Sequence, residues 1–168
     1  MLVKKSILVL GAVMMLPYLS VQAQPVPATA VLTIGAGDVS MTHLLEPTSG
    51  LHAGQLSEGT SVAEGVVRQS NLPLHGVQLT WDNSVNPAFT GGSKAIAMVL
   101  REGSQGQEGF SARFRAETSV TGLAEDYNGR YFLTEPQNEF KYEVIVTDKY
   151  EVKGGIYKMA IQAEAISA

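Results

Sequence analysis

The sequence predicts an all-β protein folded as one sandwich, and three observations support this fold class. Apolar and polar residues alternate with a period of two in several segments, as in Val77, Leu79 and Trp81 against Gln78 and Thr80. Glycine, proline and asparagine separate these segments at the short intervals typical of β-sandwiches. Apolar residues do not recur at the helical period, so we expect half-buried antiparallel strands.

Residues 1–23 have the pattern of an export signal. Met1 to Lys5 carry two lysines, Ser6 to Leu19 are almost entirely apolar, and Val21 to Ala23 offer the small residues that a signal peptidase recognises. The apolar run is shorter than the about 20 residues that span a bilayer. We therefore expect a cleaved signal peptide, and a mature protein from Gln24 to Ala168 that is exported through the periplasm.

Composition removes several function classes. The formal net charge is −4 at pH 7 and no lysine or arginine cluster occurs, so nucleic acid is not an expected partner. Cysteine is absent, which excludes disulfides, thiol nucleophiles and cysteine-bound metals. The three histidines, His43, His52 and His75, lack a metal-binding spacing, and no serine or acidic pair lies in a catalytic motif. The sequence predicts neither an enzyme nor a bound cofactor or metal.

The mature chain contains seven segments with the alternation or composition of strands. The segments between them, such as NSVNPAFTGGS and EGSQGQEG, carry turn residues. A single immunoglobulin-like sandwich accounts for this pattern, and no linker divides the chain. In order, we expect strands at Val39 to Leu45, Val62 to Gln69, Val77 to Trp81, Ala95 to Leu100, Phe110 to Ala116, Phe140 to Thr147, and from Ile156 onward.

The last segment is expected to leave the sandwich incomplete. By order it corresponds to the penultimate strand of an immunoglobulin-like fold, and no further strand follows it in this sequence. An unpaired edge of this kind is a template for another strand. We expect an open apolar groove beside its inward residues, Tyr157, Met159, Ile161 and Ala163.

The strip Ala28 to Ala36, ahead of the first domain strand, has the length and alternation of a strand. Ala28, Ala30, Leu32 and Ile34 share one face. We expect residues 24–37 to form an extension, with a glycine-rich hinge at residues 35–37, and residues 38–168 to form the domain. Two alternatives stay open: a register one residue away would use the face of Val31, and the strip could be the first strand of its own sandwich.

The two ends of the mature chain carry a family resemblance. The stretches DVSMTHLLEPTSGLHAG and VKGGIYKMAIQAEAISA, together with the alternating extension, resemble subunits of the chaperone–usher pathway. Within this family, the cysteine-free chain is most similar to subunits of the Saf-type atypical fimbriae and the capsule-forming antigens. The chaperones of these subunits have a long FG loop. The resemblance implies a six-stranded incomplete immunoglobulin-like fold that a periplasmic chaperone first completes.

At the outer-membrane usher, the resemblance implies that the extension of an identical or related subunit replaces the chaperone strand. Ala28, Ala30, Leu32 and Ile34 would then be the donor residues, and Tyr157, Met159, Ile161 and Ala163 the acceptor groove. The implied function is that of a structural subunit of a surface fimbria or capsule-like fibre that also mediates adhesion to host surfaces. The alternative is a monomeric exported β-sandwich that binds a ligand or acts as an inhibitor.

Aromatic residues in loop-rich stretches suggest a place for a host receptor. Phe89 follows an Asn-Pro pair, and Tyr127 and Tyr131 flank an Asn-Gly turn. These three residues could contact a receptor, whereas core packing is the commoner explanation for such aromatic residues.

Overall fold

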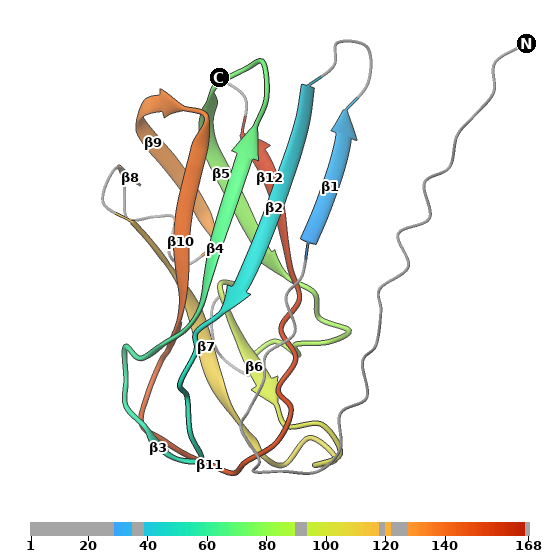
Figure 1. Cartoon of the computed structure of the whole chain (residues 1–168), viewed down its shortest axis with the longest axis vertical. Coiled ribbons are helices and arrows are strands. Elements are labelled where there is room, and N and C mark those ends of the chain that lie inside the picture. Colours follow the sequence, from blue (N-terminus) through green and yellow to red (C-terminus); the bar gives the residue numbers. More distant parts are fainter. Residues whose placement is uncertain (1–28, 35–38, 90–93, 118–119, 122–127, 167–168) are drawn as a thin grey trace, which may run out of the picture.

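The computed structural model describes residues 29–34, 39–89, 94–117, 120–121 and 128–166 (Figure 1). No helix occurs within these ranges, so none there is long and apolar enough to cross a membrane. The predicted signal peptide lies outside them. The strands are β1 (Thr29–Ile34), β2 (Val39–Pro47), β3 (Gly54–Leu56), β4 (Ser61–Gln69), β5 (Leu74–Trp81), β6 (Ile96–Leu100), β7 (Gly109–Ala116), β8 (Val120–Thr121), β9 (Arg130–Gln137), β10 (Glu139–Val146), β11 (Tyr150–Val152) and β12 (Ile161–Ile166).

The strands form two main sheets and one short ribbon. The larger sheet has the order β1-β2-β4-β10-β7-β6, and the smaller one has the order β12-β5-β9-β8. β11 and β3 pair at one end of the molecule (Figure 1). Every strand pair in these sheets is antiparallel. The two sheets enclose the core, and the predicted all-β, immunoglobulin-like fold is confirmed.

Aromatic side chains form the centre of the core. The rings of Trp81 and Phe114 stack with centroids 4.9 Å apart, and the Trp81 Nε1 atom donates to the Ala95 carbonyl oxygen over 2.9 Å. Phe114 meets Tyr142 edge to face. These residues come from both sheets, so the aromatic contacts join the two layers.

Period-two alternation identified β5 and most of β10 correctly. Val77, Leu79 and Trp81 of β5 are buried. In β10 the predicted inward residues are buried, namely Phe140, Tyr142, Val144 and Val146, but Ile145, expected to face outward, is only 1% exposed. Four short or irregular strands were not predicted: β3, β8, β9 and β11. β9 contains Pro136 and follows an Asn-Gly turn, so its sequence carries turn signals instead of a clear strand pattern.

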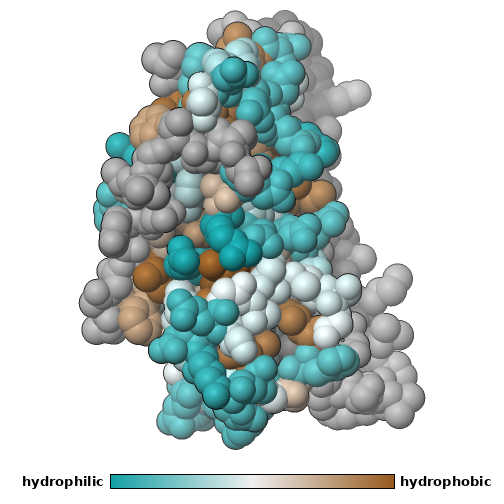
Figure 2. All heavy atoms as spheres, turned by 90° about the vertical axis from the view of Figure 1, so that its left-hand side faces the viewer, coloured by the Kyte–Doolittle hydropathy of each residue, from teal (hydrophilic) through white to brown (hydrophobic). Residues whose placement is uncertain are grey.

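Gly65 is required by close packing between β4 and β10. A Cβ atom on Gly65 would lie 2.1 Å from the ring of Tyr142. A larger residue at position 65 would therefore displace the ring of Tyr142 in the sandwich interior. On the side drawn in Figure 2, hydrophilic residues cover much of the described surface, with small hydrophobic patches between them.

Candidate functional site

The extension strip forms β1, and β1 pairs with β2 of the same chain. The ladder is antiparallel and runs from Thr29 opposite Leu44 to Ile34 opposite Val39. Ala30, Leu32 and Ile34 lie in this strand, whereas Ala28 lies outside the described residues. The strip thus occupies the edge of its own first domain strand, as the alternative for the extension anticipates.

The four predicted acceptor residues, which lie in residues 157–163 (the acceptor run), all face the interior. Tyr157, Met159, Ile161 and Ala163 are 3%, 4%, 4% and 7% exposed. β12 pairs with β5 along one edge, and no described strand pairs with its other edge. That second edge lies on the side of the sandwich where β1 and β2 are seen in Figure 1. The backbone next to the four side chains therefore offers hydrogen bonds to a further strand.

Only half of this run belongs to β12. Ile161 and Ala163 pair with β5, whereas Tyr157 forms a bridge with Arg101 at the end of β6, in the other sheet. The Glu102 amide donates to the Ile156 carbonyl oxygen over 2.8 Å. The prediction of one continuous strand from Ile156 was therefore wrong, because the chain crosses between the sheets before β12 begins.

A buried asparagine holds the crossing segment in place. Asn86 is 0% exposed, and its Nδ2 atom donates to the carbonyl oxygens of Lys158 at 2.8 Å and Met98 at 3.2 Å. The Ala160 amide donates to Asn86 Oδ1 over 2.8 Å. Residues 158–160 lie outside the described strands, so the Asn86 side chain, together with the Asp82 amide that donates to the Ala160 carbonyl oxygen over 2.9 Å, supplies hydrogen bonds that a ladder would otherwise supply. Sequence reasoning missed Asn86, which appears there as an ordinary turn residue.

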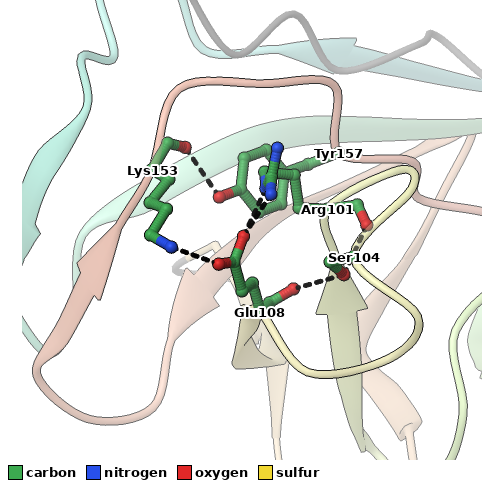
Figure 3. Close-up of polar contacts among 5 residues, drawn as sticks. All are labelled: Arg101, Ser104, Glu108, Lys153 and Tyr157. Atoms are coloured by element: carbon green, nitrogen blue, oxygen red, sulfur yellow. Dashed lines mark hydrogen bonds and ion pairs between the residues drawn. The ribbon is translucent and has the colours of Figure 1, made fainter.

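A polar cluster joins the β6–β7 loop to the segment that enters the acceptor run (Figure 3). Glu108 accepts a hydrogen bond from Arg101 Nε at 2.5 Å and forms an ion pair with Lys153. Both contacts lower the pKa of the Glu108 carboxyl group, and the contact with Lys153 has the larger effect. The Tyr157 hydroxyl donates to the Lys153 carbonyl oxygen over 2.8 Å, and Ser104 Oγ donates to that of Arg101 over 2.7 Å. The cluster fixes the ring of Tyr157 at one end of the run.

His43 is a buried residue of β2. Its ring is 0% exposed, and Nε2 is 2.6 Å from the Tyr142 hydroxyl oxygen. Burial lowers the pKa of His43 from 6.5 to about 4, and the nearby Ile161 backbone opposes this shift. The Nδ1 atom has no hydrogen-bond partner among the described residues. The histidine is therefore neutral at pH 7, and its hydrogen bond to Tyr142 joins β2 to β10.

An apolar pocket lies at the Tyr157 end of the run. It collects residues from the segment after β2, from β3, β4, β7 and β11, and from the segment before β12. Such a lining accepts an apolar side chain and offers little to a polar ligand. Its lining consists of Leu51, His52, Leu56, Val62, Phe110, Val152, Tyr157 and Met159.

The three predicted receptor contacts do not form one site. Phe89 is 40% exposed, and Tyr127 lies outside the described residues. Tyr131 is 2% exposed and packs against Phe140 with ring centroids 5.5 Å apart, so it is a core residue and its assignment as a surface contact was wrong. The described residues contain no group of three side chains suited to a metal ion.

Several solved structures share this fold. The Salmonella SafD adhesin superposes with a TM-score of 0.61 at 16% identity, over 76% of this chain and 84% of that one. HdaB, the minor tip subunit of the Escherichia coli Hda pilus, gives 0.56 at 17% identity, over 77% and 83%. A structure of AAF fimbriae from enteroaggregative Escherichia coli, described with fibronectin binding and biofilm formation, gives 0.57 at 15% identity, over 74% and 84%.

No protein-family model and no curated protein matches the chain. At these identities the structural likeness establishes the fold. The resemblance to fimbrial subunits that the sequence indicated is therefore confirmed at the level of the fold, and the neighbours named above are fimbrial subunits and adhesins, not enzymes.

Proposed function

We propose that this protein is a structural subunit of a bacterial surface fimbria or capsule-like fibre, and that its copies join by donor-strand exchange. The observation that carries the proposal is β12, which has one edge bonded to β5 and a second edge without a described partner. Beside that edge lie the four inward apolar residues and the apolar pocket. Strand addition at such an edge supplies main-chain hydrogen bonds and side-chain register together.

Strand direction favours a donor from another copy. Residues 35–38 connect β1 to β2, so the hairpin makes β1 antiparallel to β2 and points it the same way as β12 (Figure 1). A ladder between β12 and the extension of its own chain would therefore be parallel. The extension of a second copy can enter in the opposite direction and form an antiparallel ladder, which is slightly more stable per residue.

The proposal includes the route to the surface. The predicted signal peptide delivers the chain to the periplasm, where a chaperone protects the open edge of β12 until an outer-membrane usher passes the subunit to its neighbour. An exposed strand edge is an aggregation hazard, which is the physical reason for a chaperone. The assembled fibre would lie at the cell surface and contribute to adhesion there.

The test compares three versions of the exported chain: the full chain, a chain lacking residues 24–34, and that truncated chain with residues 24–36 re-attached through a flexible linker after Ala168. Unheated samples are separated in detergent. The full chain is expected to form a ladder of oligomers, and the re-attached version a single stable monomer. The truncated chain accepts a donor but cannot act as one, so adding it to the full chain should shorten the ladder.

The proposal fails if the truncated chain alone still forms long ladders, because the extension would then not be the donor. It also fails if the full chain stays monomeric at high concentration in the presence of its chaperone and usher.

One observation favours a second function. β1 pairs with β2 of its own chain over six residues, which is the arrangement expected of a monomeric exported β-sandwich that binds a ligand or inhibits a partner. In that case the full chain is a stable monomer, removal of residues 24–34 lowers its melting temperature, and no ladder forms under any condition.

A further inference from the structure

A polar groove lies on the outer face of the β12-β5-β9-β8 sheet. Its lining comes from the middle of β5, from the start of β9 with the turn before it, and from the residue that precedes Ala95. Thr80, Lys94, Asn128 and Arg130 are exposed in this groove, while the side chain of Leu79 turns into the core. The groove differs from the apolar pocket in chemistry and lies on another part of the molecule.

The floor of the groove is held rigidly. Gln78 Nε2 donates to the Asn128 carbonyl oxygen at 2.5 Å and to that of Leu79 at 3.2 Å, and Gln78 Oε1 accepts from Arg130 Nε at 2.9 Å. Gly129 has a φ of +71°, and a Cβ atom there would lie 2.1 Å from the Leu79 carbonyl oxygen. The turn therefore packs directly on β5, and Arg130 is oriented by Gln78, whose own side chain is held by two hydrogen bonds.

The groove concentrates positive charge that is not used elsewhere in the described structure. Of the lysines and arginines that follow the predicted signal peptide, six form ion pairs with carboxylates. Four do not pair within the described ranges, and two of these four, Lys94 and Arg130, line the same groove. On the neighbouring strand β12, Glu164 lies opposite Gln78 and forms no ion pair with another described residue. In a protein with a net charge of −4, two cations that line one groove attract an anion locally.

We propose that this groove binds an acidic saccharide. Arg130 and Lys94 would hold a carboxylate or sulfate group, and the hydroxyl of Thr80 and the amide of Asn128 would bind sugar hydroxyls. A neutral hydroxyl and an amide beside two cations match a polyhydroxylated anion. β5 is paired on both edges, so a peptide cannot add here as a strand, and the exposed lining offers no apolar pocket for peptide side chains.

The site is compatible with assembly but does not depend on it. Gln78 and Thr80 lie on the central strand of the sheet and face away from the core, whereas a donor strand would enter at the edge of β12. In a fibre, every subunit would therefore present the groove, and a weak single-site affinity would be multiplied by repetition. As a lone monomer the protein would bind the same ligand once.

The test uses saturation-transfer NMR, which reports on the ligand and works for monomers and fibres alike. The protein is purified after export of the full chain and titrated with 3′-sialyllactose, with a sulfated heparin disaccharide, with lactose and with a triglutamate peptide. Binding of either acidic sugar, with none of lactose or triglutamate, supports the proposal, and the better acidic sugar shows whether carboxylate or sulfate is preferred. The affinity should fall as salt rises, because the cations are exposed.

Variants separate this groove from general electrostatic attraction. Lys94→Gln and Arg130→Gln should each weaken binding at least about fivefold, the order expected for a lost charge-assisted hydrogen bond. Lys149→Gln removes an exposed cation outside the groove and should change nothing, and Glu164→Gln should tighten binding. Because Arg130 also contacts Gln78, Lys94→Gln is the decisive variant, since no hydrogen bond or ion pair of Lys94 with the described residues is lost.

The proposal is overturned if neither acidic sugar binds, if lactose or triglutamate binds as tightly as they do, or if Lys94→Gln and Lys149→Gln have equal effects. None of these results bears on whether the protein polymerises, which is read from the detergent ladder.

Discussion

Asn86→Ala is the substitution that tests how the acceptor run is built. It removes two donated hydrogen bonds and one accepted hydrogen bond from a side chain that is 0% exposed. The Ala160 amide and the Lys158 carbonyl group then lose the partner that Asn86 provides, in a segment that lies outside the described strands. An unsatisfied buried polar group costs about 1–3 kcal/mol, so the free energy of unfolding should fall by about 2–4 kcal/mol. That is a large part of a typical domain stability of about 5–15 kcal/mol.

The assay is equilibrium unfolding in urea, followed by tryptophan fluorescence, because the single tryptophan, Trp81, lies in the core next to the Asp82–Asn86 turn. Asn83→Ala is the matched control: Asn83 is exposed in the same turn, and its loss should change stability by no more than about 0.5 kcal/mol. Amide hydrogen exchange supplies a local readout, since the Ala160 amide should exchange faster in Asn86→Ala and at its original rate in Asn83→Ala.

Equal effects of the two substitutions would refute the reasoning, because the segment before β12 would then not depend on Asn86. Asn86→Asp adds a second check. It keeps the size of the side chain and an acceptor oxygen but loses both N–H donors and adds a buried charge, so it should destabilise at least as much as alanine at pH 7. Burial raises the pKa of such a carboxyl group, and its protonated form regains one donor, so part of the loss should be recovered as the pH falls.

Three further predictions concern the residues around the run. The pKa of His43 is about 4 in the folded protein and 6.5 when unfolded, so unfolding takes up a proton between pH 6.5 and pH 4. The free energy of unfolding should therefore fall by up to about 3 kcal/mol as the pH is lowered through this range. His43→Gln should make the free energy of unfolding less dependent on pH there. Gly65→Ala forces a Cβ atom into the ring of Tyr142 and should cost about 1–3 kcal/mol, seen as a lower melting temperature. Tyr157→Phe removes only the hydrogen bond to Lys153 and should cost about 0.5–1.5 kcal/mol in urea unfolding.

The fold class could be predicted because the long strands show their environment in their own sequence. In β5 and β10 each inward residue is apolar, so the period of two directly reports which face is buried. β9 and the crossing segment gave no such signal. Tyr131 lies in β9, which follows an Asn-Gly turn and contains Pro136, and residues 158–160 are bonded to Asn86, which is more than 70 residues away in the sequence.

The partner of β1 could not be decided from the sequence for a different physical reason. Alternation specifies a strand and its faces, but it carries no information about which free edge the strand occupies. The strip pairs with β2 here because four residues are enough to close an antiparallel hairpin. The same strip on another copy would present the same faces and the same hydrogen-bonding groups.

Because β1 already pairs with β2 of its own chain, the free energy of assembly would have to come from other contacts. Tyr157, Met159, Ile161 and Ala163 are already buried, so a neighbour's extension would gain little from covering them. The gain would come from new hydrogen bonds along β12, at about 0.5–1.5 kcal/mol each, and from the contacts that Leu32 and Ile34 of the donor make with the neighbour, where full burial of such a side chain is worth about 1.5–3 kcal/mol. Against this stands the loss of the ladder between β1 and β2 in the donor. Because those two sets of hydrogen bonds nearly offset, the balance should depend on Leu32 and Ile34. Their replacement by alanine should abolish the ladder of oligomers while leaving the monomer folded, and ladders that survive both replacements would show that backbone pairing alone holds the subunits together.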